Sequence, residues 1–164
     1  LMFGLDLENV SLTLPRLPCE GETDGITALA EYCRDCFADY DSERMKRLIK
    51  KKMQLGEIYI ISHKDKTVGF VIFSKKNKTL DYIAVSSDYR NSGIASRLMV
   101  TAMAQFDIGD ELSIVTFRDD HPQSDGAKRL YSKFGFGNPK NIVVQGIPLT
   151  KITAIIPDKA LTTE

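Results

Sequence analysis

The alternation of apolar and polar positions predicts a chain in which short strands and amphipathic helices follow one another. Runs rich in β-branched and aromatic residues predict strands at 11–14, 57–62, 67–74, 79–85, 111–117, 141–146 and 151–156. Apolar residues recurring every three or four positions predict helices over 24–37, 44–53, 94–106 and 127–134. Turns are expected at 63–66 and at Pro148, which separates the last two predicted strands.

The order of these elements constrains the sheet. The strands at 57–62, 67–74 and 79–85 are joined by short turns, so they are predicted to form an antiparallel meander. The strand at 111–117 must run parallel to 79–85, because a helix crosses between them. The sequence therefore predicts a mixed α/β fold. With 164 residues, we expect one domain over 1–164 that is large enough to bury a core.

The segment at 80–106 carries the clearest chemical signal. A strand ending at Val85 leads through a short polar turn into a helix that opens at Arg90–Ala95. The first N–H groups of a helix have no partner within it, and Gly93 and Ala95 keep large side chains away from them. Such a helix start attracts phosphate groups. The segment therefore predicts a phosphate-binding turn.

Charge and composition exclude some classes of function. Lys plus Arg and Asp plus Glu both number 22, so the net charge is zero and a general nucleic-acid binder is not expected. No apolar run is long enough to span a membrane and no signal peptide is evident, so a cytoplasmic location is expected. One predicted helix has a basic face, and we interpret it as solvated, although it could attract an acidic substrate, RNA or phosphates. That face comprises Arg44, Lys46, Arg47, Lys50, Lys51 and Lys52.

The cysteines do not indicate a metal or redox centre. There are three, and the spacing of Cys33 and Cys36 places both within a predicted helix. The chain has only two histidines, His63 and His121, so a zinc site lacks ligands. We expect no metal, and we expect Cys33 to pack inward.

Two segments, in the expected order, resemble the GNAT family of N-acetyltransferases. Arg90-Asn91-Ser92-Gly93-Ile94-Ala95 matches the pattern of Arg or Gln, two residues of any kind, Gly, any residue, then Gly or Ala, and it follows Ile83-Ala84-Val85. The second segment runs from Ala127 to Phe136 and reads AKRLYSKFGF. With the predicted elements, the resemblance covers most of 11–156. It implies a mixed sheet of six to seven strands flanked by about four helices. Its two central parallel strands splay apart, and acetyl-CoA fits into the gap.

The resemblance also implies roles for individual residues. The strand end at Ile83, Ala84 and Val85 would pair with the pantetheine arm of acetyl-CoA. Tyr131 matches the family tyrosine that lies near the thioester sulfur and acts as a general acid. Ser124 stands where many members have an Asn that contacts the pantetheine, and Asp125 could crowd the cofactor. The phosphates would be bound by Arg90, Asn91, Ser92, Gly93, Ile94 and Ala95.

The general base is less clearly marked. Strand alternation puts Asp81 on the same face as Thr79, Ile83 and Val85. A carboxylate there could take a proton from an incoming amine, directly or through water. An aspartate facing solvent at a strand edge is an equally good interpretation. Asp120 and His121, in the loop before the last helix, are weaker candidates.

The resemblance implies an N-acetyltransferase that moves an acetyl group from acetyl-CoA to a primary amine by direct attack, with no covalent enzyme intermediate. Two alternatives stay open. One is a weakly active acyl-CoA-binding module that senses the cofactor and regulates a partner. The other is a toxin that acetylates aminoacyl-tRNA through the basic helix. The acceptor could be a small molecule or a protein amine, and the edges of the final strands could pair in a homodimer.

Overall fold

The computed structural model describes residues 12–121 and 124–158 of the chain. Within them, four α-helices are formed, α2 (Thr23–Tyr32), α3 (Ser42–Leu55), α4 (Ile94–Met103) and α5 (Ser124–Lys133). The strands are β1 (Ile58–His63), β2 (Lys66–Ser74), β3 (Thr79–Val85), β4 (Glu111–Phe117), β5 (Gly137–Val144) and β6 (Ile147–Ile155). Short 3-10 helices lie at η1 (Glu20–Glu22), η2 (Arg34–Cys36) and η3 (Ser87–Tyr89).

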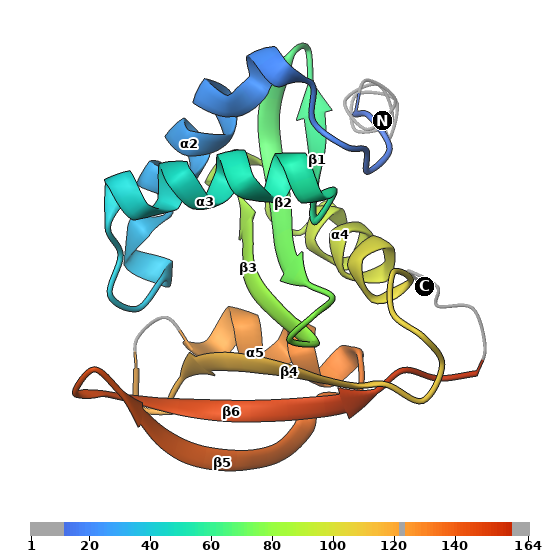
Figure 1. The fold of residues 1–164 in the computed structure, drawn as a ribbon. Helices are drawn as coiled ribbons and strands as arrows, with labels where there is room; N and C mark the ends of the chain where they lie inside the picture. The colour runs from blue at the N-terminus through green and yellow to red at the C-terminus, as the bar shows by residue number, and fades with distance from the viewer. Residues whose placement is uncertain (1–11, 122–123, 159–164) are drawn as a thin grey trace, which may run out of the picture.

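The six strands form one mixed sheet in the order β1-β2-β3-β4-β6-β5. Only β3 and β4 are parallel among these neighbours, which confirms the predicted architecture. Figure 1 shows that the sheet has two halves: β1, β2 and β3 stand upright, whereas β4, β6 and β5 run across below them.

The two halves separate between the parallel strands. The pairing of β3 with β4 consists of Thr79 opposite Ser113, where the Ser113 N–H donates to the Lys78 carbonyl oxygen (3.0 Å). Beyond this point β3 continues to Val85 without β4 beside it. The predicted splay of the central strands is therefore present.

Each face of the upright half is covered by different helices. On one face, α2 and α3 pack Ile26 and Ile49 against Phe70 and Ile72 of β2. On the other face, α4 packs five buried residues, Ile94, Leu98, Met99, Ala102 and Met103, against the sheet. Burial of such side chains is worth about 1.5–3 kcal/mol each, so these two clusters hold the helices on the sheet.

The first predicted helix is too long. α2 ends at Tyr32, and η2 follows it. Phe37 then has an extended backbone, with φ −116° and ψ 129°. Its ring packs edge-on against Tyr82 at 5.1 Å between centroids. The apolar spacing of Phe37 therefore reflects a contact with β3 and not a continuing helix.

Two further boundaries differ from the predictions. The strand predicted at 11–14 is represented by isolated bridges of Leu12 with His63 and of Arg16 with Ile60, and position 11 lies outside the described residues. The turn before β6 is Gln145-Gly146, both at positive φ, and Pro148 lies within β6. Because β4 ends opposite Leu149, the missing N–H of Pro148 breaks no pairing with β4.

No helix in the described part of the chain is both long enough and apolar enough to cross a membrane.

Candidate active site

The predicted phosphate-binding turn is formed by a backbone that only some residues can adopt. After β3 and η3, Asn91 has φ 64° and Gly93 has φ 83°, in the left-handed region that glycine tolerates best. The Arg97 N–H donates to the Gly93 carbonyl oxygen (3.0 Å) and closes the first turn of α4. The N–H groups of Ile94, Ala95 and Ser96 precede this bond and have no acceptor inside the helix. A Cβ atom on Gly93 would meet nothing within 4 Å, so space is open in front of them.

The splayed edge of β3 exposes backbone groups to the same space. The Ser86 N–H donates to the Val68 carbonyl oxygen (2.8 Å), and hydrogen-bonded pairs alternate with non-bonded ones along an antiparallel ladder. The backbone groups of Ala84 therefore face β2, whereas those of Ile83 and Val85 face the gap toward β4. The Cys33 thiol approaches the Val85 carbonyl oxygen at 3.9 Å. Most of this edge is left for a ligand to pair with.

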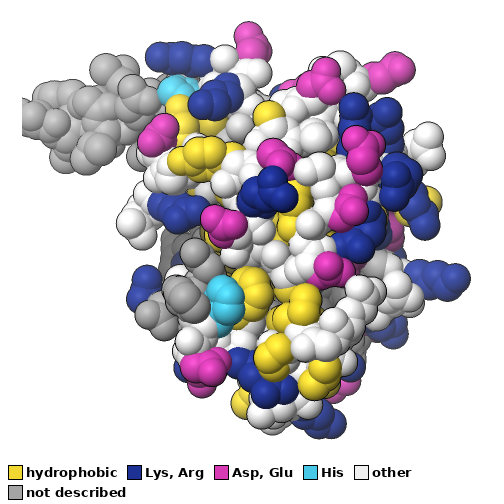
Figure 2. Space-filling view, turned by 90° about the vertical axis from the view of Figure 1, so that its left-hand side faces the viewer, with side chains coloured by type: hydrophobic (Ala, Val, Ile, Leu, Met, Phe, Trp, Pro, Cys, Tyr) yellow, Lys and Arg dark blue, Asp and Glu magenta, His cyan; other side chains and the backbone are white. Residues whose placement is uncertain are grey.

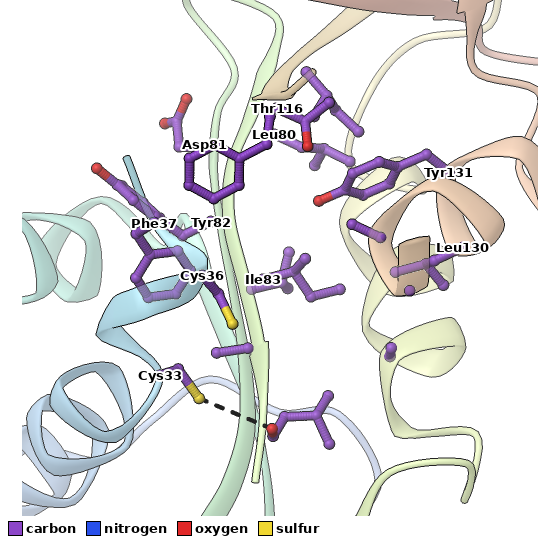
Figure 3. Close-up of a pocket in the computed structure, with 18 of the residues that line it drawn as sticks. Cys33, Cys36, Phe37, Leu80, Asp81, Tyr82, Ile83, Thr116, Leu130 and Tyr131 are labelled. Atoms are coloured by element: carbon purple, nitrogen blue, oxygen red, sulfur yellow. Dashed lines mark hydrogen bonds between the residues drawn. The ribbon is translucent and has the colours of Figure 1, made fainter. Parts of the chain in front are cut away.

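A cavity of about 890 Å³ fills the space between the two halves of the sheet. Figure 3 shows side chains of β3 at its centre, Tyr131 and Leu130 of α5 on one side, and Cys33, Cys36 and Phe37 on the other. Of the residues predicted from the sequence, it brings together Asp81, Ile83, Ala84, Val85, Arg90, Asn91, Gly93, Ile94, Ala95 and Tyr131.

Three predicted candidates do not contribute in this way, and a fourth is not tested. Ser92 does not line the cavity, and its hydroxyl donates to the Tyr89 carbonyl oxygen. The side chain of Ser124 lies outside the described part of the structure, so its predicted contact with the pantetheine stays a prediction. Asp120 and His121 are not among the lining residues, and the His121 ring stacks on Phe117 at 3.7 Å between centroids. The stacking gives His121 a packing role.

Tyr131 points from α5 into the cavity toward Ile83 (Figure 3). Its ring also contacts Phe136 edge-on, at 6.2 Å between centroids. Burial, with a smaller electrostatic contribution from the Cys36 side chain, raises the pKa of Tyr131 to about 12. The phenol is therefore protonated at neutral pH and can donate a proton.

Asp81 does not lie on the predicted face of β3. Pairing with β2 passes from Tyr82 opposite Ile72 directly to Leu80 opposite Phe73, so Asp81 is the extra residue of a β-bulge. Leu80 packs in the same cluster as Ile83, on the α4 face. The alternation is shifted at the bulge, and the prediction that Asp81 shares the face of Ile83 and Val85 is wrong.

The carboxylate of Asp81 instead lies on the α3 face while still lining the cavity. It accepts a hydrogen bond from Thr79 Oγ1 (2.7 Å) and lies 4.0 Å from Lys52 Nζ of α3. Burial raises the pKa of Asp81, although the Thr79 hydroxyl and the Lys52 charge oppose the shift. A carboxyl group with a raised pKa accepts protons more readily than an ordinary aspartate.

Comparison with known proteins decides the family. The family model for the acetyltransferase (GNAT) domain matches residues 54–137, just over half of the chain. This chain belongs to the GNAT family of acetyltransferases. The match contains both β3 and the start of α4, which carry the phosphate-binding turn, and it extends through Tyr131.

Solved structures share the fold of this GNAT domain at low sequence identity. Ard1 from Thermoplasma volcanium superimposes with a TM-score of 0.71 at 17% identity, covering 90% of this chain and 99% of that one. The protein yncA from Salmonella typhimurium, solved with its cofactor acetyl-CoA, gives 0.67 at 12% identity, covering 92% and 97%. A GNAT-family acetyltransferase from Bacillus cereus gives 0.67 at 16% identity, covering 88% and 96%. No curated protein matches the sequence.

A buried ion pair supports the α3 face of this GNAT domain. Lys52 Nζ donates to Glu57 Oε1 (2.8 Å) and to the Phe73 carbonyl oxygen (2.6 Å). Burial alone would raise the pKa of Glu57, but hydrogen bonds from Lys52 and from the Lys75 N–H outweigh it and hold the pKa below its usual value. Lys52 is therefore not part of the solvated basic face that the sequence suggested, because its side chain is only 8% exposed.

Several lining residues carried no signal in the sequence. Phe37, Val144 and Ile147 line the cavity, although they lie outside both motif segments. Lys133 of α5 donates to the Ser96 hydroxyl (3.0 Å) at the start of α4 and brings a positive charge there. Only the position of Lys133 inside the second motif segment could have drawn attention to it.

Neither the cysteines nor other side chains form a metal centre in the residues described. No group of three or more His, Cys, Asp or Glu side chains there could hold an ion. Cys33 is buried at the end of α2, as predicted, and Cys36 lies in η2. Both line the cavity as thiols and neither is in a disulfide.

Proposed function

We propose that this protein transfers the acetyl group of acetyl-CoA to the nitrogen of a primary amine, by direct attack and without a covalent enzyme intermediate. The observation that carries the proposal is the cavity that joins the open start of α4, the unpaired edge of β3 and the Tyr131 hydroxyl. Membership of the GNAT family supports the same chemistry.

The residues present fit the proposed cosubstrate. The unpartnered N–H groups at the start of α4 would hold the pyrophosphate, with the open space at Gly93 admitting it and Arg90 adding positive charge. The backbone groups of Ile83 and Val85 would pair with the amides of the pantetheine arm, which would satisfy half-buried groups that β4 leaves unpaired. Bound acetyl-CoA supplies the acetyl group as a reactive thioester. The protein yncA, which shares the fold, binds acetyl-CoA.

Proton transfer is assigned to two residues of this chain. A primary amine with a pKa near 10 must lose a proton before it attacks. The Asp81 carboxylate would remove that proton, through a water where the distance requires it. Tyr131, which is protonated at neutral pH, would donate a proton to the departing thiolate of CoA. A backbone N–H on the splayed edge of β3 would stabilise the negative charge that develops on the carbonyl oxygen.

Calorimetric titration with acetyl-CoA tests the cosubstrate site. Gly93→Glu places a negative charge where the pyrophosphate would lie and also forces Glu into a left-handed backbone. Gly109→Glu is a matched control, because Gly109 also has positive φ (91°) and open space around it but does not line the cavity. We expect micromolar binding by the parent and by Gly109→Glu, and loss of at least 100-fold in affinity for a folded Gly93→Glu. Equal affinities for the two variants would contradict the site.

Turnover distinguishes the enzyme from a sensor module. Release of CoA that depends on an added amine would support the proposed transfer. Tight binding of acetyl-CoA with no turnover on any amine would favour the acyl-CoA-sensing alternative.

A further inference from the structure

The chemical class of the acetyl-group acceptor can be inferred from the part of the cavity that lies across β3 from α4. This half is bounded by the segment between α2 and α3, by β3 and by the β5–β6 turn. The α2–α3 segment and the β5–β6 turn lie at the same, left-hand end of the molecule in Figure 1. We infer that the acceptor is a primary amine that carries one aromatic or large apolar group, with no second positive charge and no carboxylate. This inference rests on the proposed function and adds the substrate class to it.

The first argument is the apolar lining of this half. Aromatic and aliphatic side chains reach it from separate elements of the chain: Phe37, Leu48, Tyr82, Phe117, Val144 and Ile147. Figure 2, which views the molecule from this end, shows hydrophobic side chains gathered beside a histidine in the lower part of the face. A ligand group that packs against these side chains is stabilised because its apolar surface leaves water. The gain in binding free energy is about 25 cal/mol per Å² of apolar surface buried.

The aromatic part of this wall is held in place before any ligand arrives. The Phe37 ring packs edge-on against Tyr82 at 5.1 Å and stacks on Tyr40 at 6.1 Å. Phe117 is fixed by its stacking on His121. Ordered aromatic rings accept a flat apolar group without losing side-chain freedom on binding.

The second argument is the charge of this half. Among the described residues, the charged ones that line the cavity are Asp39, Arg44, Asp81, Arg90 and Arg129, of which Arg90 belongs to the phosphate-binding turn and Arg129 to α5. Arg44 is engaged by Asp39, with its guanidinium on the carbonyl oxygen and 3.6 Å from the carboxylate. The nearest cation to Asp81 is Lys52, at 4.0 Å, and Lys52 is already bonded to Glu57. Beside the α3 face, the Asp81 carboxylate is therefore only partly compensated.

One partly compensated carboxylate suits one ammonium group. A diamine would place its second ammonium against apolar side chains, which is costly without a partner. An amino acid would bring its carboxylate near Asp81, where like charges repel. An amine with a single apolar substituent meets neither penalty.

The test compares acceptors at saturating acetyl-CoA by kcat/KM. The panel is 2-phenylethylamine, a short peptide amide that begins with Phe, 1,5-diaminopentane and free phenylalanine. We expect 2-phenylethylamine or the peptide to exceed the diamine and the amino acid by at least tenfold. The better of these two tells whether the apolar amine comes from a small molecule or from a protein N-terminus. A diamine or amino acid that is used equally well overturns the inference.

A pair of neighbouring substitutions tests the wall itself. Val144 lines the cavity, whereas Val143 is 65% exposed and does not. Val144→Asp adds a negative charge beside the bound apolar group, so we expect the preference for 2-phenylethylamine over the diamine to fall about tenfold, and Val143→Asp to leave it unchanged. If both variants keep the parent's preference, the wall does not select the acceptor. Acetyl-CoA binding by calorimetry is measured for each protein, so that loss of the cosubstrate site is distinguished from a wrong acceptor class.

Discussion

The two faces of β3 are built in different ways. On the cofactor side, which α4 covers, apolar packing holds a helix whose open N-terminus points into the cavity. On the proposed acceptor side, which α2 and α3 cover, a buried ion pair lies among the packed residues, and a bulged, partly exposed aspartate lies beside it. The cofactor side depends on backbone geometry, and the acceptor side depends on side-chain charge. Substitutions on the two sides should therefore have different effects. On the cofactor side they should disturb packing or proton donation, and on the other side they should disturb the balance of charges.

The largest effect is expected from Glu57→Gln on the acceptor side. It removes the carboxylate that Lys52 contacts at 2.8 Å and leaves only Asp81 at 4.0 Å, which costs about 3 kcal/mol of unfolding free energy. The measurement is urea unfolding at pH 7. Glu111→Gln, at an exposed position of β4, is the control and should change stability by less than about 0.5 kcal/mol.

The pH dependence sharpens this test. The pKa of Glu57 is lowered in the folded state, so its contribution is present above the ordinary carboxyl pKa and is lost as the pH falls through the lowered value. The difference between parent and variant should therefore shrink in acid. Equal stability of the two proteins at pH 7 would mean that the ion pair contributes nothing.

On the cofactor side, Tyr131→Phe should lower kcat about 100-fold, which is the lower end of the range for proton transfer by a positioned side chain. The affinity for acetyl-CoA should stay within about twofold, because the ring is kept. Since the pKa of Tyr131 is raised to about 12, the parent should show no loss of rate from its ionisation up to about pH 10. An unchanged kcat would mean that Tyr131 lines the cavity but does not donate a proton in the reaction.

Gly69→Ala tests the packing of the cofactor side. A Cβ atom there would lie 2.7 Å from Ile94 Cγ2 and 3.1 Å from Leu98 Cδ1, so the Ile94 side chain or the first turn of α4 that carries it must shift. We expect a loss of about 2 kcal/mol in stability and weaker binding of acetyl-CoA. Gly21→Ala meets nothing within 4 Å and serves as the control. If Gly69→Ala binds acetyl-CoA as the parent does, α4 is not held in place by this contact.

The smallest effect is expected from Asp81→Asn, about tenfold in kcat/KM, which is below the usual range for direct proton transfer because a water would relay the proton. The parent's rate should rise with pH as Asp81 ionises, at a pH above that of an ordinary aspartate. In the Asp81→Asn variant this ionisation is absent, so the rate should depend on pH only through the ionisation of the amine substrate. The pH profiles of the two proteins are compared.

Stability provides a second measurement for Asp81. Because its folded pKa is raised, its stabilising contribution is present in the protonated form at low pH and is lost as the pH rises through that value. Asp81→Asn should therefore melt at the same temperature as the parent, or higher, at pH 7. A lower melting temperature would point to a structural role.

Much of the cofactor side could be predicted from the sequence. The strand at 79–85, the helix start at Ile94 and the helix ending before Gly135 agree with the structure, because each depends on residues close together in the chain. The parallel pairing of β3 and β4 followed from the crossing helix. The same local rules misplaced Phe37 and Pro148, where contacts with other strands decide the backbone.

The sequence by itself determined the family, the order of strands and helices, and the turn that presents the start of α4, since a strand, a small-residue turn and a helix are local choices of backbone. Only the tertiary structure decided the acceptor side. The bulge that turns Asp81 toward α3 arises from pairing with β2, and the burial of Lys52 requires Glu57 and the Phe73 carbonyl. The apolar wall brings Phe37 together with Val144 and Ile147, which lie more than a hundred residues further along the chain. A local sequence pattern cannot predict a contact between residues so far apart.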